Sequence, residues 1–379
     1  MGANRMRSLV AVLLACVCGS ACEPYATISD ERTSYAVRVD PNPTPPADPA
    51  PTSLKVMTWN IKFGAARIDF WFDLWGDTVQ MSVDDVNGNL ENIYALINEV
   101  HPDVLLTNEI DINSRRSQYV DMVQGILEHT HLNYAGYVPT WKSRYIPSEG
   151  VGRMDMGNAI FSTYPMRSIE GLPLTQRHDQ DALTDYFYLH RSVARAILDL
   201  GDGVNVVVLG AHTDAYDTDG TKSQQLREIK DILDAETLPV VIAGDFNAIP
   251  PTSIHTSGFN DDNPDALGTE FETPPYVLTD MQPFFDDYVP ETSLDRYGAT
   301  ESAQSHFYSH SIIGPNTIGS QGEAGFWTRK LDYLFVRAPS SWRPDSTDVL
   351  QETGRLGITL NPLFLSDHAP VVGVWEFPR

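Results

Sequence analysis

The sequence has few cysteines, little positive charge and only one long apolar run. All three cysteines lie within the first 22 of its 379 residues, which excludes a scaffold built on disulfides and a zinc site held by cysteines. The one apolar run near membrane-spanning length is also N-terminal, which excludes a protein with several membrane spans. Lysine and arginine total 26 against 51 aspartates and glutamates, a formal net charge of −25. That balance argues against a protein that coats nucleic acid through a basic surface.

Residues 1–22 have the composition of a secretory signal peptide. Arg5 and Arg7 precede an apolar stretch over residues 9–18, and small residues then lead to Cys22. The residues before Cys22 resemble a bacterial lipobox, in which that cysteine is acylated; free secretion is the alternative. We therefore expect an exported protein, either a cell-envelope lipoprotein tethered to a membrane through Cys22 or a secreted protein.

The rest of the chain divides into a linker and one domain. Six prolines in residues 41–51 remove backbone donors and favour extended chain, which predicts a Pro-rich linker over residues 23–52. A single domain is expected over residues 53–379, with insertions near residues 65–88 and 255–330.

The domain alternates apolar runs typical of strands with helix-like segments. Helical spacing of apolar residues is found over residues 90–100 and 223–235. Strands are expected at residues 55–61, 103–109, 203–210, 238–244, 331–336 and 371–377. Short strands mixed with helices in this way indicate stacked sheets flanked by helices.

Polar residues able to bind a metal or move a proton recur where these runs begin or end. They are Asn60, Glu109, His212, Asp245, Asn247, Asp332, Asp367 and His368. Residues at strand ends are held by a rigid sheet, so this repetition predicts one shared site. Carboxylates and amides are hard ligands suited to Mg²⁺, with Mn²⁺ or Ca²⁺ as alternatives. Together with histidine, such a metal can hydrolyse a phosphate ester.

The order of these motifs resembles the endonuclease/exonuclease/phosphatase superfamily of DNase I-like phosphoesterases. The motifs are Thr58-Trp59-Asn60-Ile61, Asn108-Glu109, Gly157-Asn158-Ala159-Ile160-Phe161-Ser162, His212-Thr213-Asp214, Gly244-Asp245-Phe246-Asn247, Leu331-Asp332-Tyr333 and Ser366-Asp367-His368. The resemblance runs from about residue 54 to 376. It implies an α+β fold, a four-layer α/β/β/α sandwich of two packed mixed sheets flanked by helices. One departure is Asn108, where the family usually has glutamine.

The resemblance also implies a role for each site residue. Glu109 is the main metal carboxylate, supported by Asn60, and Asp367 is the second. The catalytic set is His212, Asp245, Asn247, Asp332 and His368. In that set Asp245 orients or activates water, and Asp332 pairs with the acid/base histidine His368.

Contacts to the substrate phosphate are expected from Asn158, Tyr145 and Arg191. For the tyrosine or arginine that often touches the phosphate in this superfamily, Arg144 and Arg153 are alternatives to Tyr145. Arg195 is likewise an alternative to Arg191.

Several functions remain open. The resemblance implies a phosphodiester hydrolase, and nucleic acid is the expected substrate and partner of an expected monomer. The alternatives are a phospholipid or sphingomyelin phosphodiesterase, a phosphatase on small or inositol phosphates, and an inactive member that binds a partner. The first insertion holds Phe70, Trp71, Phe72, Leu74 and Trp75, which either pack on the sandwich or form an exposed wall that stacks on a base or enters lipid. The second insertion holds 12 acidic against 3 basic residues, and its Asp261, Asp262 and Asp265 form either a Ca²⁺ site or a solvated loop.

Overall fold

A computed structural model describes residues 28–43, 50–73, 76–216, 218–269, 271–316 and 325–378. The predicted signal peptide with Cys22, and Leu74 and Trp75 of the first insertion, lie outside the described residues. Within the described ranges, no helix has the length and apolarity needed to cross a membrane.

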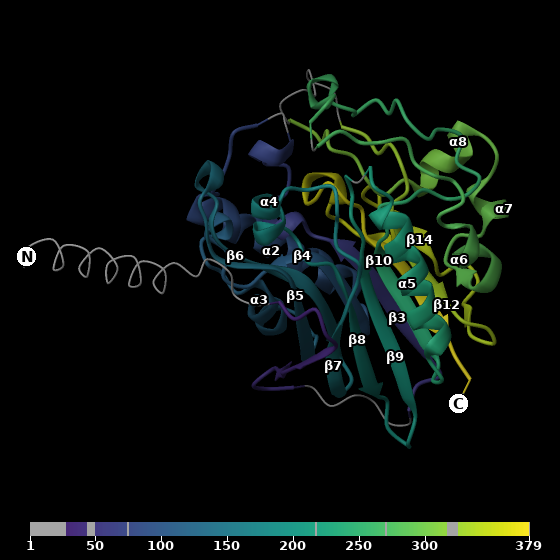
Figure 1. The fold of residues 1–379 in the computed structure, drawn as a ribbon. Coiled ribbons are helices and arrows are strands. Elements are labelled where there is room, and N and C mark those ends of the chain that lie inside the picture. Colours follow the sequence, from purple (N-terminus) through teal and green to yellow (C-terminus); the bar gives the residue numbers. More distant parts are fainter. Residues whose placement is uncertain are drawn as a thin grey trace, which may run out of the picture.

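Two mixed sheets lie face to face (Figure 1). One has seven strands in the order β1-β7-β8-β9-β10-β12-β11, and the other runs β13-β15-β3-β4-β6-β5-β2, with β14 paired to β15. The strands of the first half of the chain are β1 (Thr33–Tyr35), β2 (Val37–Val39), β3 (Ser53–Asn60), β4 (Val104–Asp111), β5 (Tyr134–Ile146), β6 (Gly152–Ser162) and β7 (Met166–Pro173). The later strands are β8 (Ser192–Asp199), β9 (Asn205–His212), β10 (Val240–Asp245), β11 (Val289–Pro290), β12 (Asp332–Val336), β13 (Ser341–Trp342), β14 (Asp348–Val349) and β15 (Val371–Glu376).

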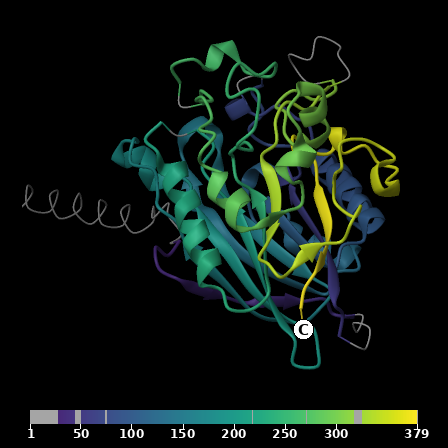
Figure 2. The ribbon, with the colours of Figure 1, turned by 90° about the vertical axis from the view of Figure 1, so that its right-hand side faces the viewer.

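Helices cover the outer face of each sheet. The described α-helices are α2 (Val83–Val100), α3 (Met122–His129), α4 (Ala182–Phe187), α5 (Thr221–Ala235), α6 (Gln282–Asp287), α7 (Leu294–Tyr297) and α8 (Glu301–Gln304). Figure 2 shows α5 and the α2/α3 pair on opposite outer faces with both sheets between them. This is the four-layer α+β sandwich that the sequence predicts.

Three apolar layers hold the sandwich together. Leu106 of β4 and Val208 of β9 belong to the core between the sheets. Ile93 of α2 lies in a second core beneath that helix, and Ile229 of α5 lies in a third. Because the central strands are buried on both faces, they read as continuous apolar runs in the sequence. Each such side chain contributes about 1.5–3 kcal/mol when it is fully buried.

The predicted linker is wrong for residues 33–39. There, β1 pairs with β7 at the edge of one sheet and β2 pairs with β5 at the edge of the other. Arg38 also makes an ion pair with Asp121, 2.7 Å between Nη1 and Oδ2. The physical reason is that alternating residues such as Tyr35 and Val37 pack against the central core. We call residues 33–39 the N-terminal strap.

Two aromatic residues of the first insertion, Phe70 and Phe72, pack inward. Phe70 is buried and makes an edge-to-face contact with Phe63, with ring centroids 4.9 Å apart, and Phe72 packs against the same core. For these two rings the packing interpretation is confirmed. The second insertion carries α6, α7 and α8, and Figure 1 shows these helices at the upper right of the sandwich. Asp261 there is buried in an ion pair with Arg329, so the structure does not support the alternative of a Ca²⁺ site at Asp261.

Candidate active site

The motif residues meet because the strands that carry them end at one edge of the sandwich. The β3 and β4 strands are parallel, with Asn60 opposite Asn108. In the other sheet β9 and β10 are parallel, with His212 opposite Asp245. The antiparallel strand β12 begins opposite the end of β10, so Asp332 lies beside Asp245.

Glu109 is presented by a bulge in β4. The pairing of β4 with β6 shifts register between Thr107 and Ile110, and Glu109 has a φ of 55°. A bulge re-aims a side chain, and a non-glycine residue in this region is retained where the surroundings impose it. The amide of Asn60 donates to Glu109 Oε1 at 3.0 Å, while its own oxygen accepts from the Lys62 N–H. In this structure Asn60 therefore orients Glu109.

Asp245 lies at the centre of the cluster. Its Oδ2 is 3.5 Å from Nε2 of His212 and 3.6 Å from Nε2 of His368. The Asn60 amide reaches the same oxygen at 3.3 Å. Gly244 precedes it with a φ of +143°, and a Cβ on that glycine would lie 1.9 Å from the Ala211 carbonyl oxygen. The close approach of β9 and β10 that positions Asp245 therefore requires glycine.

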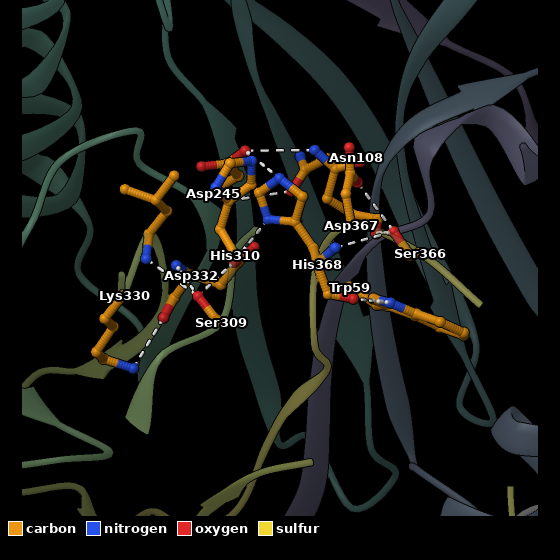
Figure 3. Close-up of polar contacts among 12 residues, drawn as sticks. Trp59, Asn108, Asp245, Ser309, His310, Lys330, Asp332, Ser366, Asp367 and His368 are labelled. Carbon is orange, nitrogen blue, oxygen red and sulfur yellow. Dashed lines mark hydrogen bonds and ion pairs between the residues drawn. The ribbon is translucent and has the colours of Figure 1, made fainter. Parts of the chain in front are cut away.

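His368 bridges two carboxylates, as Figure 3 shows. Its Nδ1 lies 2.8 Å from Asp332 Oδ2, and the Ser309 hydroxyl donates to that same oxygen at 2.7 Å. The ring of His310 contacts the ring of His368 edge to face, with centroids 4.6 Å apart. These contacts fix the imidazole so that its Nε2 faces Asp245.

Asp367 is held by a buried lysine. Lys62 Nζ lies 3.5 Å from Asp367 Oδ2 and 2.9 Å from Asp73 Oδ2. Burial alone would raise the pKa of Asp367, but the positive charges of Lys62 and His368 lower it to about 2. Asp367 is therefore ionised throughout the physiological pH range.

The pKa values of Asp245 and His368 are both raised above their usual values. Burial raises the pKa of Asp245 to about 7 and outweighs the opposing charge of His368. Burial would lower the pKa of His368, but the carboxylates of Asp332 and Asp245 raise it to about 10. A base near neutrality thus faces a protonated imidazole. Burial, followed by the charge of Asp367, raises the pKa of Glu109, a repulsion that a bound cation would relieve.

His212 ends β9 and Arg191 directly precedes β8, both in the sheet that carries Asp245, whereas Asn158 lies in β6 of the sheet that carries Glu109. Burial and the charge of Arg191 hold the pKa of His212 well below its usual value, so its imidazole is neutral. Arg191 is buried and lies 3.2 Å from Asp214, and its Nη1 has no hydrogen-bond partner among the described residues. Asn158 accepts from the Asn108 amide at 2.9 Å and donates to the Ser192 carbonyl, so it braces the site from within.

Of two further predicted residues, Asn247 contacts the cluster through its backbone and, within the described ranges, Tyr145 does not contact it. Asn247 donates its amide to the Thr213 carbonyl at 3.0 Å, and its backbone N–H bonds to Asp245 Oδ1. Tyr145, near the end of β5, is 60% exposed, and no contact of its ring with the cluster is found among the described residues. Its contact with the phosphate stays a prediction.

Four supporting residues were not assigned a role from the sequence. Ser309 and His310 come from the second insertion, where no motif marks them, and Lys62 is a lysine just after the first strand. The side-chain oxygen Oδ1 of Asn108 accepts from the Asp245 N–H at 3.1 Å, and its side-chain amide donates to the Ala211 carbonyl. Asn108 therefore joins the two sheets beneath the site. Its place beside Glu109 in the motif was the only signal for it in the sequence.

Comparison with known proteins supports the same assignment. The model of the endonuclease/exonuclease/phosphatase family matches residues 57–368. No curated protein matches the chain.

Two solved structures show the fold. The endonuclease/exonuclease/phosphatase from Beutenbergia cavernae DSM 12333 is 19% identical, with a TM-score of 0.50 over 86% of this chain and 72% of that one. The endonuclease/exonuclease/phosphatase from Bacteroides vulgatus is 14% identical, with a TM-score of 0.50 over 86% of this chain and all of that one. With a family model that spans most of the domain, the chain belongs to the endonuclease/exonuclease/phosphatase family, whose members are phosphoesterases that depend on divalent metal ions.

Proposed function

We propose that the chain is an exported, Mg²⁺-dependent phosphodiesterase. The observation that carries the proposal is the environment of Asp245: a carboxylate with a pKa of about 7, within 3.6 Å of two imidazoles. Carboxylates suited to a hard cation adjoin it. Export is supported by the composition of residues 1–22.

The donor set fits a divalent cation on the side of Glu109. Asp245, Asp332 and His368 also offer ligand atoms within 4.8 Å of one another, but the 2.8 Å bond between Asp332 and His368 already uses two of these atoms. The side chain of Glu109 is 25% exposed, whereas Asp245 and Asp332 are almost fully buried. Glu109 and Asp367 are therefore the residues that would hold the metal. When bound, such a cation neutralises charge on the phosphate oxygens.

Two side chains of the protein, Asp245 and His368, each carry out one proton transfer. A water that attacks phosphorus gives a proton to Asp245 Oδ2. As the ester bond breaks, the protonated Nε2 of His368 donates a proton to the leaving oxygen. Asp332 holds the His368 ring in place and stabilises its positive charge. Neutral His212 and buried Arg191 bind the non-bridging oxygens.

Nucleic acid is the first substrate class to test, and a phospholipid or sphingomyelin diester is the second candidate. The excess of carboxylates in the insertion near residues 255–330 favours the lipid diester. A chain with a net charge of −25 repels a long polyanion more than it repels a zwitterionic headgroup. Phosphatase activity on small or inositol phosphates is the remaining alternative.

The experiment is a panel of substrates at one salt concentration, with Mg²⁺ or with EDTA. Double-stranded DNA, single-stranded DNA, RNA, sphingomyelin, inositol phosphates and an activated aryl phosphodiester are compared. We expect hydrolysis that EDTA abolishes, and a rate that falls about a hundredfold or more in His368→Ala, measured below the melting temperature of that variant, which falls because Asp332 loses its buried partner. Near-normal hydrolysis by a folded His368→Ala protein would contradict the assignment.

A further inference from the structure

Both insertions line a cavity beside the candidate active site. Trp71 of the first insertion and Phe271 of the second are in edge-to-face contact, with centroids 5.8 Å apart. Phe271 also contacts Tyr216, in the loop after β9, at 5.9 Å. The cavity at these rings is open to solvent and has a volume of about 60 Å³. The catalytic steps proposed above do not use it.

The walls of this cavity combine aromatic rings with carboxylates. We call it the acidic aromatic pocket and define it by Phe72, Tyr216, Phe271, Asp73, Asp262 and Glu272. Neither lysine nor arginine is among the described residues that line it. Such a wall repels phosphate, and it attracts a cation through both the carboxylates and the electron-rich faces of the rings.

The three carboxylates are unequally neutralised. Asp73 is paired with Lys62, and Asp262 lies 3.4 Å from Arg329. Glu272 accepts the Gly268 N–H at 2.8 Å, and the part of the chain that the structure describes gives it no cationic partner within 4.0 Å. The pocket therefore holds a carboxylate whose charge is available to a ligand.

The pocket adjoins the reacting centre. Lys62 separates Asp73 from Asp367, with its Nζ 2.9 Å from one carboxylate and 3.5 Å from the other. On another side Ile312 lines the pocket, and the preceding residue, Ser311, donates its N–H to the Asp367 carbonyl at 3.0 Å. When a diester binds with its phosphate at the cluster, one side chain separates that phosphate from the pocket. One of the two ester substituents can therefore reach into the pocket.

We propose that the acidic aromatic pocket is a subsite for an organic ammonium group carried by one ester substituent of the substrate. The inference rests on the proposed phosphodiesterase function and narrows its substrate to zwitterionic diesters, which join a phosphate to a positively charged alcohol. Such a group occurs in the headgroup of a membrane lipid and in soluble glycerol diesters.

The pocket is tested first by binding alone, without metal and without turnover. The probe is choline, and its comparator is its uncharged carbon isostere, each titrated into the full chain and followed by saturation-transfer NMR. We expect choline to bind, the isostere to bind about tenfold more weakly, and Glu272→Gln and Phe271→Leu each to weaken choline binding by about the same factor. The matched control is Glu91→Gln on the exposed face of α2, with unchanged binding.

Hydrolysis then separates the subsite from the catalytic centre. With Mg²⁺, wild-type protein is compared on an aryl phosphodiester, on soluble glycerophosphocholine and on vesicles of phosphatidylcholine. We expect Glu272→Gln to lower the rate on the choline diesters relative to the aryl diester by about tenfold, while Glu91→Gln leaves that ratio unchanged. The soluble and vesicle arms distinguish the two sources of the ammonium group.

Each failure has a different meaning. Metal-dependent hydrolysis of the aryl diester without choline binding would overturn the subsite and leave the phosphodiesterase standing. Choline binding that depends on Glu272, without hydrolysis of any diester, would support the subsite and contradict the proposed function. Nucleosides that bind in preference to choline, with the same dependence on Glu272, would overturn the ammonium proposal in favour of a nucleobase site.

Discussion

At the scale of single residues, the candidate site depends on buried charges that neutralise one another. Lys62 is only 3% exposed and contacts Asp73 and Asp367. The imidazole of His368 likewise lies between two buried carboxylates, those of Asp332 and Asp245. A buried charge left without its partner is costly, because neither water nor protein compensates it.

Replacing Lys62 by methionine is therefore expected to destabilise the fold. Lys62→Met leaves Asp73 and Asp367 without their common cation, and the pKa of Asp367 rises from about 2. We expect a loss of about 3–5 kcal/mol in the free energy of unfolding, measured by urea denaturation. The control is Lys230→Met, which also removes a lysine with two carboxylate partners, Asp234 and Asp287, but on the surface; there we expect a change of about 1 kcal/mol or less. Equal losses in the two variants would show that the burial of Lys62 has no special role.

The sequence motifs identify the main site residues, but they do not show which other residues those side chains contact. Glu109, Asp245 and His368 could be found in the sequence because each follows or precedes an apolar run. Ser309 and His310 could not, because nothing in an irregular, acidic insertion indicates that it returns to contact β12. The sequence also did not predict the bulge at Glu109, since a bulge has no characteristic amino-acid composition.

At the scale of elements, the site exists because two pairs of parallel strands end together. Strands β3 and β4 bring Asn60 and Glu109 to the edge of one sheet, and β9 and β10 bring His212 and Asp245 to the edge of the other. The sequence predicted these four strands because they are buried on both faces and therefore read as apolar runs. The strands β1 and β2 were missed because each has three residues and lies next to a Pro-rich segment.

Gly244 tests how closely the parallel strands must approach. In Gly244→Ala the new Cβ would meet the Ala211 carbonyl oxygen at 1.9 Å, so β10 must move and displace Asp245. We expect a loss of about 3 kcal/mol or more in the free energy of unfolding. In the control, Gly210→Ala, the Cβ meets Leu106 at 3.5 Å and Ala194 at 3.6 Å, and we expect about 1 kcal/mol or less. A stable, fully active Gly244→Ala protein would refute the packing argument.

At the scale of the whole molecule, the N-terminal strap joins the edges of both sheets. It adds β1 to one sheet and β2 to the other, and its apolar side chains extend the core between them. A domain boundary drawn at residue 53 therefore removes part of the sandwich. The sandwich itself could be predicted, because the order of the motifs along the chain implies it.

A shortened chain measures what the strap contributes. A protein that begins at residue 53 loses the burial of Tyr35 and Val37 and the Arg38–Asp121 ion pair. We expect its melting temperature to fall by about 5 °C or more compared with a chain that begins at residue 28, as measured by calorimetry. Identical melting temperatures would show that the strap only lies on the surface.

The whole proposal depends on Glu109 and Asp367 holding a metal that serves phosphodiester hydrolysis. The most direct measurement is the rate of aryl phosphodiester hydrolysis as a function of Mg²⁺ concentration, for the wild-type protein and for Glu109→Gln. We expect saturable activation by the metal in the wild type and a half-saturation point at least about tenfold higher in Glu109→Gln. A wild-type rate that does not depend on the metal, or the same half-saturation point in a folded Glu109→Gln protein, would contradict it.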